Sequence, residues 1–343
     1  MPRMGGSPPR HVDEPEAARF RARNDRIVLV ALAVFVALLG LLALRGGFEL
    51  SPDVLAVAAA TGLVLVVRNR PTFREWAPFL VLGLAYELIR GDTAALLAMV
   101  HVGDMAALER ALFAGYLPTQ VLQAWLHPKH GLDLVAAVAT ILYILHTALP
   151  VVVGAFLWVR DRASYYDYVA ALVVLSMAAF LTYLILPVAP PWWAASHGFL
   201  NGANGHPELA YLKPSAFDSL AASAGLDGHV LFGLTFGDIS PDQVASFPSL
   251  HAAYPFLAYL FARRVLGRAR WAVLAYAAAV WFAVVYLGDH YVVDVIAGVV
   301  YTLVAYAFVV GWERMAARRV QLARPAEVPV EAAAMARPQA WLE

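Results

Sequence analysis

The sequence predicts an all-α protein, a polytopic membrane helix bundle of about eight transmembrane helices with interfacial helices on its outer side. Hydrophobic residues make up 61% of the 343 residues and charged residues 15%, a balance that soluble domains do not show. Long uncharged runs recur along the chain, and about 20 apolar residues suffice to cross a bilayer. The net charge of zero gives no indication of a nucleic-acid partner. The absence of cysteine excludes disulfides, thiolate zinc sites and a cysteine nucleophile.

Eight apolar stretches predict the spans, and two of them, the second and third, are short enough to be tilted or partly interfacial. Between the third and fourth lies an amphipathic stretch, typical of helices on a membrane surface. The spans are predicted at residues 27–44, 53–67, 75–90, 133–159, 167–188, 249–265, 271–288 and 292–311, and the amphipathic stretch at 91–131.

These stretches divide the chain into four regions. The first is polar and rich in proline and arginine, which predicts a disordered cytoplasmic N-terminus. The N-terminal region covers residues 1–26, and residues 27–131 hold the first spans and the interfacial stretch. A catalytic membrane core, with an outer loop over 189–248, covers residues 132–312, and a cytoplasmic tail covers residues 313–343.

The basic residues predict the orientation. With the N-terminus in the cytoplasm, 20 of the 25 lysines and arginines fall inside and five fall outside, as the positive-inside rule expects. Eight of the ten histidines then lie outside. His146 falls within a span, where packing against a partner helix with a backbone hydrogen bond is expected. The prediction is a multi-pass plasma membrane protein with both termini in the cytoplasm.

Two histidines are predicted to meet at the outer membrane boundary. One span descends from His251 and the next ascends to His290, so the two return to the same level. Asp294 follows His290 by four residues, so on a helix both share one face. The carboxylate can accept the imidazole Nδ1–H, which leaves Nε2 as a nucleophile or base. Gly298, one turn further, would allow close helix packing.

Two imidazoles and a carboxylate beside a helix N-terminus suit phosphoryl transfer. One imidazole attacks phosphorus, the carboxylate stabilises the imidazolium that forms, and the second imidazole protonates the leaving oxygen. Pro248 opens the helix, and Ser249 with the first N–H groups would hold non-bridging oxygens. No metal or cofactor is required. A helix-capping role for His251 and a purely structural His290–Asp294 pair are the alternatives.

The motifs that carry these residues resemble those of the type 2 phosphatidic acid phosphatase superfamily. "SFPSLHAAYP" and "VVYLGDHYVVDVIAG" are similar to its second and third motifs, approximately P-S-G-H and S-R-x5-H-x3-D. Leu250 stands in place of the Gly, and Ala283 and Val284 in place of the Ser and Arg. The first motif, K-x6-R-P, has no match. "TYLILPVAPPWWA" resembles the inositol phosphorylceramide synthase branch, which also lacks the third-motif Arg.

The resemblance implies a six-helix-type phosphatase core with its catalytic residues in 132–312. It makes His290 the nucleophile, His251 the general acid/base and Asp294 the residue that orients His290. The missing motif cations leave the phosphate charge to other residues, with Lys213, then Arg90 and then Lys129 as candidates. Further predicted substrate contacts are Trp192 and Trp193, which could equally form an interfacial aromatic belt, and Asp218.

The predicted function is a metal-independent lipid phosphotransferase that works through a phosphohistidine on the extracytoplasmic side. The resemblance suggests inositol phosphate as the transferred group, with a phospholipid or polyprenyl phosphate as substrate and a polyol or other alcohol as acceptor. Transfer to water, as in a lipid phosphate or polyprenyl pyrophosphate phosphatase, is the first alternative. A transporter is the second, although the sequence has no internal repeat and its polar residues gather at one face.

Overall fold

A computed structural model of the chain describes residues 13–44, 75–83, 85, 97, 99–127, 133–200 and 244–323. Over these ranges the secondary structure is helical. Extended pairing there is limited to two isolated parallel bridges, which join His101 to Val188 and Val188 to Ala245. The all-α prediction is confirmed. The second predicted span, 53–67, lies outside the described residues.

The described helices follow the predicted spans with shifted ends. Residues 75–83, from the third predicted span, are also helical. The predicted interfacial stretch holds two short helices, α5 and α6. The helices are α1 (Glu14–Leu44), α5 (Gly103–Leu112), α6 (Pro118–Leu126), α7 (Leu134–Arg160), α8 (Arg162–Ile185), α9 (Pro191–Ser196), α12 (Leu250–Ala262), α13 (Arg270–Tyr286) and α14 (Val292–Ala323), with a 3₁₀ turn at Gly267–Ala269.

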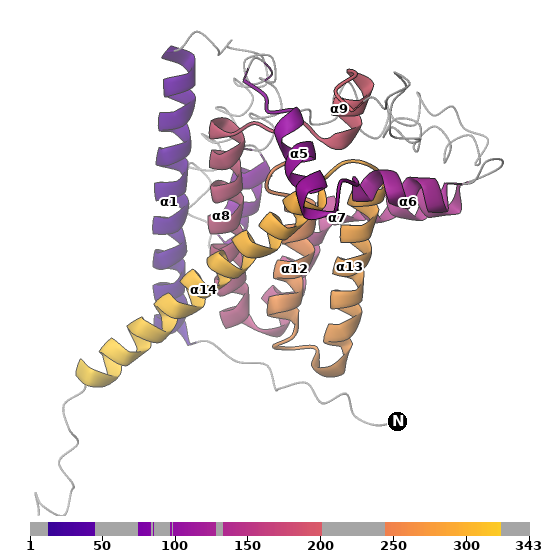
Figure 1. Cartoon of the computed structure of the whole chain (residues 1–343). Helices are drawn as coiled ribbons and strands as arrows, with labels where there is room; N and C mark the ends of the chain where they lie inside the picture. Colours follow the sequence, from indigo (N-terminus) through magenta and orange to yellow (C-terminus); the bar gives the residue numbers. More distant parts are fainter. Residues whose placement is uncertain are drawn as a thin grey trace, which may run out of the picture.

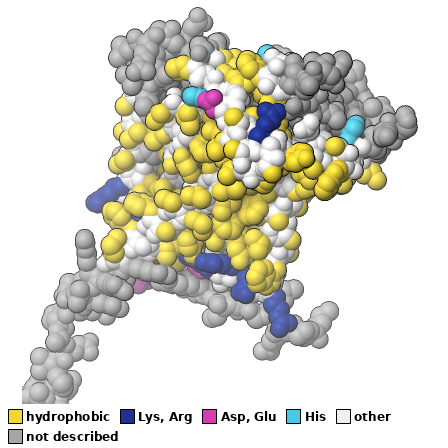
Figure 2. All heavy atoms as spheres, in the orientation of Figure 1, with side chains coloured by type: hydrophobic (Ala, Val, Ile, Leu, Met, Phe, Trp, Pro, Cys, Tyr) yellow, Lys and Arg dark blue, Asp and Glu magenta, His cyan; other side chains and the backbone are white. Residues whose placement is uncertain are grey.

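The described helices are those of a membrane protein. Arg162–Ile185, Gly267–Tyr286 and Val292–Trp312 are long and apolar enough to cross a bilayer. The two halves of α7 add a fourth span if the 53° bend between them lies within one span. α12 is shorter, at 13 residues. Hydrophobic side chains cover the middle of the face seen in Figure 2.

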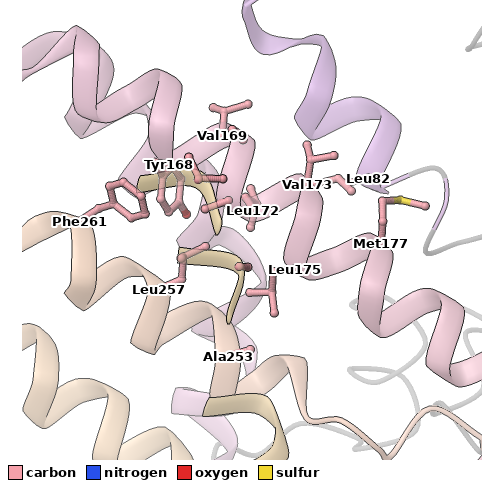
Figure 3. Packing of buried hydrophobic residues seen from close by; sticks show 14 of the residues in the cluster. Leu82, Tyr168, Val169, Leu172, Val173, Leu175, Met177, Ala253, Leu257 and Phe261 are labelled. Carbon is pink, nitrogen blue, oxygen red and sulfur yellow. The ribbon is translucent and has the colours of Figure 1, made fainter. Parts of the chain in front are cut away.

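α8 lies at the centre of the bundle. In the most apolar stretch of Arg162–Ile185, 72% of the residues are buried, against 33% in those of Gly267–Tyr286 and Val292–Trp312. Leu172 and Leu175 of α8 lie against Leu257 and Ala253 of α12 (Figure 3). Because lipid is as apolar as these side chains, close van der Waals packing is what favours their association.

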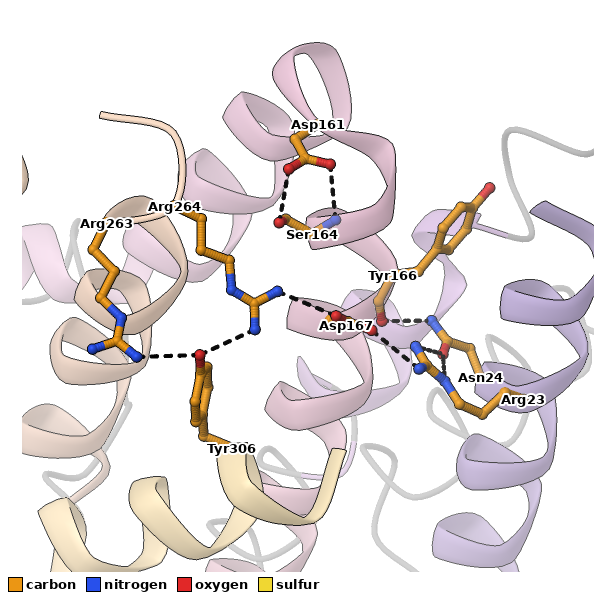
Figure 4. Close-up of polar contacts among 9 residues, drawn as sticks. All are labelled: Arg23, Asn24, Asp161, Ser164, Tyr166, Asp167, Arg263, Arg264 and Tyr306. Carbon is orange, nitrogen blue, oxygen red and sulfur yellow. Dashed lines mark hydrogen bonds and ion pairs between the residues drawn. The ribbon is translucent and has the colours of Figure 1, made fainter. Parts of the chain in front are cut away.

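One end of the bundle, which we call the arginine end, holds Arg23, Arg162, Arg263 and Arg264. Asp167 of α8 accepts from Arg23 of α1 at 3.1 Å and from Arg264, which follows α12, at 3.2 Å (Figure 4). Arg263 and Arg264 both donate to the hydroxyl of Tyr306 on α14. One carboxylate thus ties together helices that are far apart in the sequence.

The opposite end, which we call the histidine end, comprises α5, α6, α9 and the turn 287–291 between α13 and α14 (Figure 1). These are segments that the sequence predicts on the outer side. The loops that join α7 to α8 and α12 to α13 lie at the arginine end. The arrangement matches the predicted sidedness, and the orientation in the membrane stays a prediction.

Both predicted terminal regions differ from the structure. α1 begins at Glu14, so residues 14–26 are helical and not disordered. The Asp13 carboxylate accepts the N–H of Glu16 at 2.8 Å, which caps the helix. Phe20 stacks on Tyr166 of α8 at 5.5 Å, so this polar segment folds by docking on the bundle. α14 extends to Ala323, past the predicted boundary at 312. Residues 1–12 and 324–343 lie outside the described residues.

Candidate active site

The turn 287–291 carries His290. Gly288 has a φ of 74°, a conformation that favours glycine, and it lets the chain leave α13 sharply. The N–H of His290 donates to the carbonyl of Val284 at 3.2 Å, which fastens the turn to the end of α13. α14 begins at Val292, so His290 lies outside that helix. The expectation that His290 and Asp294 share one helical face is therefore wrong.

The imidazole of His290 is oriented by Ser246. Its Nδ1 lies 2.9 Å from the carbonyl oxygen of Ser246. The nearest carboxylate oxygen of Asp294 is 3.6 Å from Nδ1, too far for a hydrogen bond. Since a carbonyl can only accept, Nδ1 carries the proton and Nε2 keeps its lone pair. The predicted tautomer is found, but the acceptor is a backbone carbonyl and not the predicted carboxylate.

Asp294 acts on the histidine through its neighbours. Its Oδ2 accepts from the Ser246 hydroxyl at 2.6 Å and from the N–H of Tyr291 at 2.8 Å. The second bond is one half of a capping box, because Asp294 is the third residue of α14. Oδ1 is buried and has no hydrogen-bond partner within the part of the chain that the structure describes. The oxygen nearest to Nδ1 of His290 is therefore the hydrogen-bonded Oδ2.

His251, in the first turn of α12, is in contact with His290. Its Nδ1 lies 3.0 Å from Nε2 of His290, although 39 residues separate the two. Because Nε2 of His290 is the acceptor, Nδ1 of His251 is the donor. The prediction that the two imidazoles meet at one level is confirmed.

Ser249 and Pro248 form the entry to α12. Ser249 is the N-cap, fully buried, and its Oγ accepts the N–H of Ala252 at 3.2 Å. Pro248 precedes the cap, so it does not open the helix as predicted; its carbonyl accepts from the Tyr183 hydroxyl at 2.7 Å. A Cβ at Gly298 would lie 2.3 Å from the carbonyl oxygen of Ser249, which confirms close packing of α14 at this glycine.

Ser246 was missed by the sequence analysis, although it stands in the quoted second motif. Its N–H donates to the carbonyl of Val188 at 3.1 Å. Val188 is in turn bridged to His101, whose carbonyl accepts the N–H of Ala189 at 3.0 Å. Three segments from different parts of the chain thus hold the carbonyl that orients His290.

The two tryptophans of α9 differ in their surroundings. Trp192 is 7% exposed. Its backbone N–H donates to the carbonyl of Gly288 at 2.9 Å, so its main chain supports the turn that carries His290. Trp193 is half-buried and stacks on His197, with 3.8 Å between ring centroids. Contact of either residue with substrate stays a prediction.

His146 and Tyr143 of α7 also lie at the site. The His146 ring centroid is 3.8 Å from that of His251, and the Tyr143 centroid is 4.6 Å from it. Nδ1 of His146 lies 2.5 Å from the carbonyl of Tyr143, which gives the expected backbone hydrogen bond. The sequence signal for this placement is Pro150, four residues later, which indicates a break in the helix.

Glu109 of α5 is a buried carboxylate that the sequence analysis did not single out. Its Oε1 accepts the N–H of Val292 at 2.6 Å, so α5 caps the start of α14. Burial, together with the charge of Asp294, raises the pKa of Glu109 to about 7, although backbone N–H bonds from Val292 and Val293 act in the opposite direction. Oε2 has no hydrogen-bond partner among the described residues. No pattern in the amphipathic stretch distinguished this acid from its neighbours.

Four predicted substrate contacts, Lys213, Arg90, Lys129 and Asp218, lie outside the described residues. Within the described part of the histidine end, Arg110 on α5 is the one lysine or arginine. The pKa of Tyr291 is raised, by burial and by the charges of Asp294 and Glu109, and the positive charge of Arg110 acts in the opposite direction.

Comparison with known families agrees with this geometry. The family described as the PAP2 superfamily matches residues 103–308, which contain α5 and every residue of the histidine contact. The family match begins at residue 103, before residue 132, where the membrane core is predicted to begin. No solved structure matches the chain.

Curated relatives narrow the comparison. "Phosphoinositol dihydroceramide synthase" of Bacteroides thetaiotaomicron is 29% identical over 263 residues, which cover 73% of this chain and 81% of that protein. "Inositol phosphorylceramide synthase" of Candida albicans is 28% identical over 172 residues, or 48% of this chain and 34% of the relative. The catalytic subunit aur1 of Schizosaccharomyces pombe is 26% identical, over 39% of this chain and 30% of the relative. The chain thus spans about a third of the length of these two fungal relatives.

Proposed function

This chain belongs to the PAP2 superfamily, and from that premise we propose that it transfers a phospho-headgroup from a membrane lipid to an alcohol. The names of the relatives support inositol phosphate as the group and a ceramide-type alcohol as the acceptor. The observation that carries the proposal is the 3.0 Å contact between Nδ1 of His251 and Nε2 of His290. It pairs a lone pair with a proton donor, which are the two groups that displacement at phosphorus requires.

The first half of the reaction forms a phosphohistidine. Nε2 of His290 attacks phosphorus, and the bond from phosphorus to the donor's lipid oxygen breaks. His251, protonated on both ring nitrogens, gives its Nδ1 proton to that oxygen and becomes neutral. The His290 ring becomes cationic while Nδ1–H stays bonded to the Ser246 carbonyl. The Asp294 carboxylate, 3.6 Å from Nδ1, stabilises that positive charge.

The second half reverses these roles. His251 takes the proton from the acceptor hydroxyl, the acceptor oxygen attacks phosphorus, and the bond from phosphorus to His290 breaks. The net result moves one proton from the acceptor to the released lipid alcohol, so both imidazoles return to their starting state. No outside proton donor is consumed.

Substrate binding must separate the two imidazoles. In phosphoryl transfer the attacking and leaving atoms stand on opposite sides of phosphorus. A nitrogen-to-nitrogen distance of 3.0 Å leaves no room for a phosphoryl group between them. The His251 ring therefore moves away from His290 when the substrate enters, and the hydrogen bond between them is exchanged for one to the leaving oxygen.

The proposed location of the reaction is the extracytoplasmic face. The bias of 20 inner against five outer basic residues supports this orientation. The histidine contact lies at the end of the bundle opposite to the arginine end, where Arg23 and Arg264 meet at Asp167.

The test uses the purified full-length chain in phospholipid vesicles. An inositol phospholipid labelled in its headgroup is supplied with dihydroceramide, and transfer of the label to the ceramide is measured. His290→Gln should abolish transfer, and rapid quenching of the wild type with donor alone should trap the labelled headgroup on the chain. Release of label only as free inositol phosphate would assign water as the acceptor instead. Transfer retained in His290→Gln would overturn the assigned nucleophile.

A further inference from the structure

We propose that His146 is a positioning residue for the general acid/base, and this inference rests on the function proposed above. It would hold the His251 ring so that Nδ1 faces the reacting oxygen during proton transfer. The role is carried by an aromatic ring in close contact with His251, not by a proton that His146 itself donates.

The backbone of α7 directs His146 toward His251. The helix is bent by 53° between Leu134–His146 and Ala148–Arg160. Pro150 has no N–H to give to the carbonyl of His146, and its ring crowds that carbonyl, so the break falls at this residue. A straight helix would carry the two halves of α7 along one axis, so the bend sets where His146 meets α12.

Contacts fix the His146 ring in one orientation. Its Nδ1 lies 2.5 Å from the carbonyl of Tyr143, which can only accept, so Nδ1 carries a proton. This bond fixes the His146 ring beside His251.

His251 is in contact with two aromatic rings of α7. The Tyr143 ring stacks on it with an interplanar angle of 21°, and the His146 ring lies closer, with 3.8 Å between centroids and an angle of 39°. Aromatic faces attract cations, so both rings suit a histidine that carries an extra proton when a lipid alcohol must be protonated. Stacked rings also restrict rotation of the His251 side chain while it moves to admit the substrate.

A positioning role and a merely structural role predict different responses to the leaving group. A lipid alcohol leaves as a poor anion and needs the proton from His251. A donor in which p-nitrophenol replaces the lipid alcohol releases a stable anion and needs no proton. Loss of positioning should therefore slow the first donor far more than the second, whereas general disturbance of the site should slow both.

The experiment measures turnover of the full-length chain with both donors. We expect His146→Ala to slow the lipid donor by about 100-fold and the nitrophenyl donor by less than about threefold, since general acid catalysis contributes roughly 10²–10⁴-fold. His146→Phe keeps an aromatic face and should restore the lipid donor to within about fivefold of wild type. Leu145→Ala is the matched control, because Leu145 neighbours His146 on α7 but is 54% exposed, so its truncation should leave both rates unchanged.

The outcomes separate the two proposals. Equal slowing of both donors in His146→Ala and in His146→Phe, or no slowing of either, overturns the role of His146 while wild-type transfer still supports the proposed function. A wild type inactive toward both donors overturns the function and with it the role of His146. Thermal melting of each variant identifies any that has lost its fold, and the Phe variant then decides the case.

Discussion

The two ends of the bundle differ in how their carboxylates are bonded, half-buried ones at the arginine end and buried ones at the histidine end. At the arginine end, Asp167 is bonded by Arg23 and Arg264, and Glu75 by Arg162 and by the indole N–H of Trp158. At the histidine end, the hydrogen bonds of Asp294 and Glu109 come from backbone N–H groups and one serine hydroxyl. Each of these two carboxylates also keeps one buried oxygen without a hydrogen-bond partner in the described ranges.

This difference separates charge used for stability from charge kept for chemistry. An arginine that neutralises a carboxylate connects two helices. Little of the carboxylate's negative electrostatic potential then remains to act on other groups. A carboxylate held by neutral donors keeps its negative potential, and at the histidine end that potential acts on a ring that becomes cationic during the proposed reaction. The comparison predicts that matched substitutions at the two ends affect different measured quantities.

The largest expected effect is on turnover at the histidine end. Asp294→Asn keeps the shape of the side chain but removes the charge 3.6 Å from Nδ1 of His290. We expect headgroup transfer to fall by roughly 10²–10³-fold, as when one group that stabilises charge in the transition state is removed. The melting temperature should change little. A large drop in melting temperature with normal turnover per folded molecule would contradict the comparison.

The second expected effect comes from crowding between α12 and α14. Gly298→Ala places a Cβ where the carbonyl oxygen of Ser249 lies 2.3 Å away, so the two helices must separate. The shift moves His251 relative to His290, and we expect transfer to fall by about 100-fold, because a 1 Å misplacement can have that effect. Gly311→Ala is the matched control on α14, since its added Cβ meets no atom within 4 Å. Equal activity in the two variants would show that the close approach is unimportant.

The third effect belongs to the arginine end. Asp167→Asn removes the charge that Arg23 and Arg264 share and leaves two partly buried arginines facing each other. We expect the free energy of unfolding to fall by about 3 kcal/mol, as when one partner of a buried pair is removed. Turnover per folded molecule should stay within about twofold. Denaturation in detergent, followed by an activity assay of the surviving fraction, separates the two quantities.

The smallest effect is a pH dependence of stability from Glu109. The pKa of Glu109 is raised from 4.5 to about 7, so between these values the folded chain binds a proton that the unfolded chain has released. Its contribution to stability is therefore greatest below about pH 4.5 and falls as pH rises to about 7, by on the order of 2 kcal/mol. Glu109→Gln should remove this slope in melting temperature between pH 5 and 8.

The matched control for Glu109 lies on the same helix. Asp104 is exposed and pairs with His101, so Asp104→Asn should leave the slope as it is in the wild type. A wild-type slope that persists in Glu109→Gln would mean that another group titrates, and would remove the assigned role of Glu109 as the pH-sensitive cap of α14.

The meeting of His251 and His290 was predictable because two spans of similar length, one down and one up, return the chain to the same level. The partner of His290 was not predictable from spacing. The four-residue separation from Asp294 indicates a helical pair only if the helix includes His290, and the turn at Gly288 delays α14 until Val292. Residues 14–26 could be recognised as polar from the sequence, but their docking on α8 depends on Tyr166, more than a hundred residues away.

By itself the sequence determined a helical membrane protein, the two histidines and the acid that meet at one end, and the glycine that lets α14 approach α12. The membrane class, the meeting of the histidines and the glycine follow from local rules of length, hydropathy and helical period, and the acid was identified by its place in the third motif. Tertiary structure decided that Ser246 orients His290, that Glu109 caps α14 and that the His146 ring lies against His251. Each of those contacts joins segments whose distance in space is set by the packing of the whole bundle, and no local rule of spacing encodes it.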